Sequence, residues 1–120
     1  MQEDMILQGI QPLPLPQKAT STIYIESNYT FKDGDTLYMT IKTKPDNDYT
    51  DADALLKKEW VFGTDCDYDN EGYLALPLSE ADTSIDFGDY YYDIKLVNAN
   101  CKAPIAVGPC KILPVMTLRA

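Results

Sequence analysis

The stretch TLYMTIKT at residues 36–43 carries the clearest structural signal in the chain. Its apolar side chains, Leu37, Met39 and Ile41, occupy every second position, and the residues between them are polar or tyrosine. Successive side chains of a strand point to opposite faces, so these three share one face. The alternation predicts a strand that lies half in a hydrophobic core and follows a turn at residues 32–35.

The same alternation recurs before and after this strand. It appears at residues 23–25, 73–78 and 89–97, and two shorter apolar runs follow around residues 103–107 and 110–116. About seven strands separated by turn signals predict an antiparallel β-sandwich or barrel. The expected core consists of the inward-facing members of these strands: Ile23, Leu37, Met39, Ile41, Trp60, Leu74, Leu76, Tyr90, Tyr92, Ile94 and Leu96.

Residues 51–60 fit two interpretations. The capping sequence at residues 50–53 precedes an apolar run that suits a helix, whereas residues 56–62 alternate as a strand does. The β pattern on both sides favours a short turn followed by a strand.

Residues 1–17 differ from the rest of the chain. Proline and leucine alternate from Pro12 to Pro16, which favours an extended backbone because proline cannot donate the amide hydrogen bond of a helix. We therefore expect an extended N-terminal arm before a domain at residues 18–120. The arm is either a flexible terminus or a strap that lays Ile10, Leu13 and Leu15 on a neighbouring subunit.

The charge and composition exclude several classes of function. The 120 residues include 10 Lys and Arg against 19 Asp and Glu, a formal net charge of −9. Such an acidic chain repels phosphate backbones and anionic lipid, so we expect neither nucleic acid nor a membrane as a partner. Histidine, the commonest general base and zinc ligand, is absent, and no nucleotide-binding or serine-hydrolase motif is present. The composition predicts no catalytic residues, no cofactor and no metal.

The three cysteines, Cys66, Cys101 and Cys110, lack the spacing of a structural zinc site. Cys101 and Cys110 flank a turn-like Lys-Ala-Pro sequence, so a disulfide across a hairpin is one interpretation. Reduced thiols packed as small apolar side chains are the simpler one.

An acidic loop begins at Asp65 like a calcium-binding loop, with further acids at Asp67 and Asp69. However, Asn70 and Leu76 stand where such a loop requires a glycine and a bidentate glutamate. A solvated acidic loop between strands is the ordinary alternative.

Four segments form an ordered set of motifs: Asp33-Gly34-Asp35-Thr36 leading into LYMTIKTK, then ALLKKEW, YLALPLSEADTSIDFGDYYYDIKLVN and PIAVGPCKILPVMT. In the third segment, Asp82 and Thr83 suit a tight turn and Gly88 suits a sharp start to the next strand. Tyr90 and Tyr92 bring rings to the core with hydroxyls that reach the backbone at its edge. The set resembles the immunoglobulin-like domain at the start of phage and prophage baseplate upper proteins, over about residues 32–117.

The resemblance implies an immunoglobulin-like sandwich in a structural protein of a phage or prophage tail. Its expected partners are other virion or tail subunits, and it would act through protein contacts without enzyme activity. An N-terminus that begins with acidic rather than basic residues predicts no secretory signal, in agreement with a virion component assembled in the bacterial host cytoplasm.

Outward-facing tyrosines are the other candidate contact residues, namely Tyr24, Tyr38 and Tyr91. A carbohydrate-binding module that uses these rings as a stacking platform is the alternative function.

The strand edges and the arm together predict a homo-oligomer or a ring contact. Pro77 would block strand pairing at one edge, whereas the strand that ends near Met116 has no such protection and would accept another chain.

Overall fold

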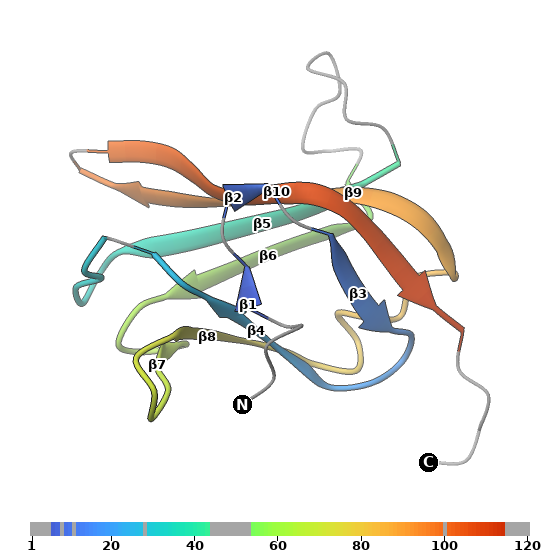
Figure 1. Cartoon of the computed structure of the whole chain (residues 1–120), viewed down its shortest axis with the longest axis horizontal. Helices are drawn as coiled ribbons and strands as arrows, with labels where there is room; N and C mark the ends of the chain where they lie inside the picture. Colours follow the sequence, from blue (N-terminus) through green and yellow to red (C-terminus); the bar gives the residue numbers. More distant parts are fainter. Residues whose placement is uncertain are drawn as a thin grey trace.

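A computed structural model describes residues 6–7, 9–10, 12–27, 29–43, 54–99 and 101–114, with the backbone alone for residues 6, 7, 9, 10 and 101. These residues form strands and turns without a helix. The strands build two sheets that face each other across a hydrophobic core (Figure 1). The predicted all-β sandwich is confirmed.

Sheet 1 has four strands in the order β1 (Ile6–Leu7), β4 (Ser21–Ile25), β8 (Leu74–Leu78) and β7 (Asp67–Tyr68). Sheet 2 has the order β2 (Gly9–Ile10), β10 (Cys101–Leu113), β9 (Gly88–Asn98), β5 (Thr36–Lys42) and β6 (Leu56–Val61). A further strand, β3 (Leu13–Pro16), pairs with β10 beyond β2. The three N-terminal strands pair in parallel with their neighbours, and all other pairs are antiparallel.

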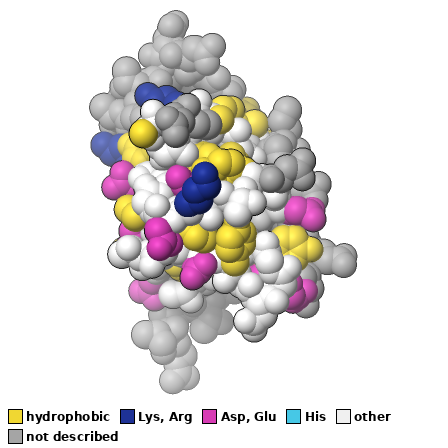
Figure 2. Space-filling model, turned by 90° about the vertical axis from the view of Figure 1, so that its left-hand side faces the viewer, with side chains coloured by type: hydrophobic (Ala, Val, Ile, Leu, Met, Phe, Trp, Pro, Cys, Tyr) yellow, Lys and Arg dark blue, Asp and Glu magenta, His cyan; other side chains and the backbone are white. Residues whose placement is uncertain are grey.

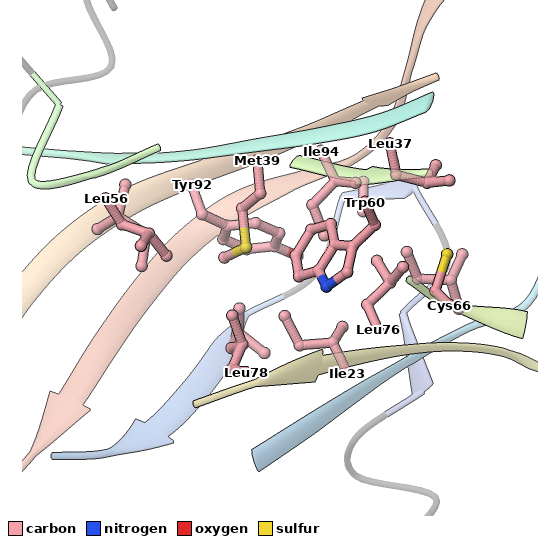
Figure 3. Packing of buried hydrophobic residues seen from close by; sticks show 14 of the residues in the cluster. Ile23, Leu37, Met39, Leu56, Trp60, Cys66, Leu76, Leu78, Tyr92 and Ile94 are labelled. Carbon is pink, nitrogen blue, oxygen red and sulfur yellow. The ribbon is translucent and has the colours of Figure 1, made fainter. Parts of the chain in front are cut away.

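Trp60 occupies the centre of the core between the two sheets (Figure 3). Its side chain is 1% exposed, and its Nε1 donates a hydrogen bond to the Pro77 carbonyl at 2.9 Å. Every residue of the predicted core is buried except Tyr90, which is half-buried and packs against the core. Period-two alternation therefore identified the inward faces of β4, β5, β8 and β9 correctly.

Of residues 51–60 the structure describes 54–60, and those from Leu56 onward form strand β6. β6 pairs antiparallel with β5, which confirms the strand interpretation. The capping sequence at residues 50–53 lies outside the described residues.

The described part of the N-terminal arm pairs with strands of its own chain. β3 pairs in parallel with β10, and Leu13 and Leu15 are 1% and 0% exposed in the core of their own chain. The expectation that these two leucines lie on another subunit is therefore wrong, because their side chains are buried in the apolar core of their own chain beside β10. The backbone of Ile10 pairs opposite Val107, and the side chain of Ile10 lies outside the described part.

The prolines of β3 protect the free edge of this strand. The backbone N–H of Gln17, just after β3, donates a hydrogen bond to the Leu113 carbonyl at 2.9 Å. Backbone groups of alternate residues point to the same side of a strand, so Leu13 and Leu15 bond toward β10 while Pro14 and Pro16 point away. Because proline has no N–H, the outer edge presents no amide donor there to another strand.

β10 is one long strand rather than the two shorter strands expected from the sequence. It pairs with β9 along its length and with β2 and β3 on its other side from Ala106 onward. The prediction of an open edge in this strand is thus wrong for the pairing region from Ala106 to Leu113. Met116 lies outside the described residues.

The opposite flank of the sandwich is protected in another way. The edge of β8 that continues past the short β7 carries Pro77, and the Pro77 carbonyl already accepts a hydrogen bond from the Trp60 indole. Just after β8, the backbone amide of Ser79 donates to the Asp82 carboxylate at 2.8 Å. On β6, Lys58 lies on the inward-facing side and forms an ion pair with Asp82 at 3.0 Å. An inward-pointing charge and an edge proline both discourage a further strand.

The corner between β8 and β9 is built by the residues of the third sequence motif. Thr83 is 1% exposed, and its hydroxyl accepts from the Ala19 amide and donates to the Ala19 carbonyl. Gly88 has φ +152°, a value that side-chain-bearing residues rarely adopt, and the Tyr90 hydroxyl donates to the Asp86 carbonyl at 2.8 Å. The Asp82 carboxylate accepts the Ser79 amide and the Thr83 hydroxyl donates to the Glu80 carbonyl, as predicted for a tight turn, whereas the bonds between Thr83 and Ala19 join segments that are distant in the sequence.

Candidate functional site

The three outward-facing tyrosines lie on two opposite faces of the sandwich. Tyr24 is on the outer face of sheet 1, because Ile23 and Ile25 fill the inner one. Tyr38 and Tyr91 are on the outer face of sheet 2. The structure therefore does not bring the three rings together as one stacking platform.

Tyr91 forms part of an exposed patch of apolar and charged side chains that we call the Tyr91 surface, which comprises Pro12, Pro14, Asp89, Tyr91, Pro109 and Lys111. Tyr91 is 41% exposed and lies opposite Pro109 across the β9–β10 pair. These side chains surround a shallow depression of about 380 Å³. The sequence predicted that Leu13 and Leu15 of the arm make surface contacts, but these leucines are buried in the core and the prolines of the arm lie at the surface instead.

Tyr24 lines a larger depression that we call the Tyr24 groove, with Thr22, Lys58, Glu59, Asp65 and Pro77 among its other lining residues. The groove has a volume of about 1000 Å³ and runs over the protected flank of β8 and β6. Its volume lies at the upper end of the range of small-molecule sites.

The cation of the Tyr24 groove is already compensated. Lys58 pairs with Asp82, whose side chain is largely buried. Burial by itself would raise the pKa of Asp82, but hydrogen bonds from Ser79 and Lys58 and the charge of Lys58 lower it below its usual 3.8. Glu59 and Asp65 are exposed, so the groove presents excess negative charge at neutral pH.

The aspartates of the loop at residues 65–69 accept hydrogen bonds from backbone amides of the loop and its flanking residues. The Asp65 carboxylate accepts the Val61 amide at 2.9 Å, and that of Asp67 accepts the Tyr68 amide at 2.7 Å. Asp69 accepts two amides, from Glu71 and Tyr73, both at 2.9 Å. These bonds account for the acids as loop caps.

Acidic side chains are scattered over the end of the sandwich that Figure 2 shows, at the left of Figure 1, rather than gathered at one point. Within the described ranges, no three Cys, Asp or Glu side chains are grouped as ligands for a metal ion.

A buried carboxylate that sequence reasoning missed lies at the end of the sandwich near the β4–β5 loop. Asp35 is 6% exposed and accepts hydrogen bonds from the Tyr29 hydroxyl at 2.8 Å, the Lys32 amide at 3.0 Å and the Asn98 amide group at 3.2 Å. Desolvation raises the pKa of Asp35, but these hydrogen bonds and the nearby Lys32 charge bring it below 3.8. The turn signal at residues 32–35 indicated a loop, but Asn98 is 63 residues away and left no local trace.

Phe31, beside this carboxylate, stacks on Phe62 with ring centroids 5.9 Å apart. The Tyr68 ring meets Phe62 edge-on at 5.3 Å, and its hydroxyl accepts the Phe31 amide at 2.8 Å. The aromatic cluster and Asp35 together close this end of the core, which makes them structural.

The cysteines are packed as thiols where the structure describes them. Burial raises the pKa of Cys66 to about 11 and that of Cys110 to about 12, which disfavours the reactive thiolate. Cys101 and Cys110 lie along one strand rather than across a hairpin. At a rise of about 3.3 Å per residue they are roughly 30 Å apart, beyond the reach of a disulfide.

In comparisons with known proteins, no family model and no curated protein matches the chain. None of the described residues forms a helix long and apolar enough to cross a membrane.

Proposed function

We propose that the chain is a non-enzymatic docking domain of a phage or prophage tail, an immunoglobulin-like sandwich that holds other virion subunits through protein contacts. The observation that carries this proposal is the β8–β9 corner. The motif that most resembles the baseplate family is the segment in which Thr83, Gly88 and Tyr90 each perform a defined structural task.

The strand order agrees with this proposal. An immunoglobulin-type sandwich places its second, fifth and fourth strands in one sheet and its seventh, sixth and third strands in the other. The order β4-β8-β7 opposite β10-β9-β5-β6 corresponds to this arrangement, with β6 as the added strand of the variable type. The Tyr90 hydroxyl bond at the start of β9 corresponds to the tyrosine corner of such domains.

The protected edges discourage docking by addition of a strand, so we expect side chains rather than backbone edges to make the contacts. Pro14 and Pro16 protect one flank, and Pro77 and Lys58 protect the other. The Tyr24 groove then offers a ring, hydroxyl side chains and an acidic rim to a neighbouring tail subunit.

Particle association tests the proposal. Tail particles purified after prophage induction from the source strain should contain the chain in constant ratio to the other tail proteins, measured by mass spectrometry of sedimented particles. Tyr24→Ala should lower its incorporation, whereas the matched variant Tyr38→Ala on the other sheet should not. A chain absent from the particles would overturn the proposal, and glycan binding that Tyr24→Ala abolishes would favour the carbohydrate alternative.

A further inference from the structure

The outer face of β9 and β10 carries two rows of complementary side chains. In one row Tyr91 lies directly opposite Pro109, and in the next Asp89 lies directly opposite Lys111. All four side chains point outward, because Tyr92, Cys110 and Ile112 fill the inner face. Each row thus pairs an aromatic ring with a proline, or an acid with a base, across neighbouring strands about 4.8 Å apart.

We infer that the Tyr91 surface binds a second copy of this chain face to face. The two-fold axis lies midway between the two facing sheets, runs parallel to the strands and passes above the gap between β9 and β10. Such an axis places β10 of the second copy over β9 of the first. Tyr91 then packs on Pro109 of the second copy, and Asp89 meets Lys111 of the second copy. Both contacts occur twice, as a two-fold interface requires.

Charge complementarity selects a second copy as the occupant. Within the described residues, neither Asp89 nor Lys111 has an ion-pair partner inside its own chain. Under the proposed two-fold axis each of these charges lies over the opposite charge of the second copy, so the surface is complementary to itself.

The net charge of −9 opposes self-association, but the outer face of sheet 2 carries little of it. The outward-facing described residues of this sheet include more lysines than acids: Lys42, Lys57, Lys95, Lys102 and Lys111 against Glu59, Asp89 and Asp93. Repulsion between two such faces is correspondingly small at physiological salt.

The inference goes beyond the proposed function, since it concerns the purified chain alone and holds whatever particle contains it. Sedimentation velocity of the full chain over a range of concentrations should show a reversible monomer–dimer equilibrium. Tyr91→Ser should weaken the dimer at least about tenfold. The matched variant Tyr24→Ser, on the opposite sheet, should leave the dissociation constant unchanged.

Charge reversal separates the two-fold contact from effects within one chain. Lys111→Glu and Asp89→Lys should each be monomeric alone, because each places like charges together twice in the dimer. An equimolar mixture of the two single variants should form a heterodimer, since both inter-chain pairs are then of opposite charge. Circular dichroism and urea unfolding would show that each variant is folded.

Three results would overturn the inference. The first is a wild-type chain that stays monomeric up to about 1 mM. The second is a dimer that Tyr91→Ser leaves intact. The third is a mixture of the two charge variants that stays monomeric while both are folded.

Discussion

Trp60 connects the two sheets through both packing and a hydrogen bond. Its indole fills the centre of the core, and its N–H donates to the carbonyl of Pro77 at an edge of β8 where no other described strand is paired. Trp60→Ala should lower the free energy of unfolding by roughly 3–5 kcal/mol because it leaves a cavity. Trp60→Phe keeps a ring and should lose about 1–3 kcal/mol, through smaller volume and the lost hydrogen bond.

Urea unfolding followed by circular dichroism measures both variants without using the fluorescence of the substituted residue. Equal losses for Trp60→Ala and Trp60→Phe would show that the indole N–H, rather than the ring, accounts for the contribution of this side chain.

Asp35 makes the stability of the sandwich depend on pH. Its pKa is lower in the folded chain than the usual 3.8, so the folded state stabilises the ionised carboxylate relative to the unfolded state. The resulting stability is present above the unfolded pKa, near 4, and is lost as the pH falls through the folded value. We expect the melting temperature of the wild type to fall below about pH 4.

Asp35→Asn should be less stable at pH 7 and should show a shallower decline on acidification, measured by thermal melts from pH 7 to pH 2.5. Asp33→Asn, at an exposed position in the same turn, should retain the wild-type profile. A steep wild-type decline that Asp35→Asn reproduces in full would assign the acid sensitivity to other carboxylates such as Asp82.

At the scale of elements, β3 combines two tasks in one alternating sequence. The leucines supply core contacts and the hydrogen bonds to β10, while the prolines leave the free edge without amide donors. Pro16→Thr restores an N–H at that edge and should increase aggregation on mild destabilisation, followed by light scattering in low urea.

Pro114→Thr makes the same chemical change just after β10, where the residue is exposed and belongs to no strand. It should leave aggregation at the wild-type rate. If both variants aggregate equally, the missing amide at the β3 edge is not what protects the chain.

At the scale of the whole molecule, the N-terminal segment is part of the folding unit. Removal of residues 1–17 deletes Leu13 and Leu15, which each contribute about 1.5–3 kcal/mol by burial, and leaves β10 unpaired along one side. The loss is comparable to the total stability of a small domain, about 5–15 kcal/mol. A chain that starts at Lys18 should therefore be largely unfolded or aggregated at 25 °C.

Circular dichroism and thermal melting measure this effect, and the full-length variant Leu15→Ala should show an intermediate loss of about 2–5 kcal/mol. A truncated chain with the wild-type melting temperature would mean that β3 rests on the sandwich without stabilising it.

The sequence by itself determined the properties that depend on neighbouring residues. Alternation placed Leu37, Met39 and Ile41 on a buried face because the side-chain direction in a strand repeats every two residues. The corner at Gly88 was equally readable, because a turn is built from adjacent residues. The same local logic identified residues 12–16 as extended, which the structure confirms for β3.

Only the tertiary structure decided which surfaces lie together. An extended segment does not specify its partner, so the sequence could not assign β3 to β10 or show that β10 is one strand. Tyr24 and Tyr91 have the same local pattern yet face opposite ways, because their strands belong to different sheets. Pairing and sheet membership depend on the total apolar surface that distant segments bury together, and no short stretch of sequence contains that quantity.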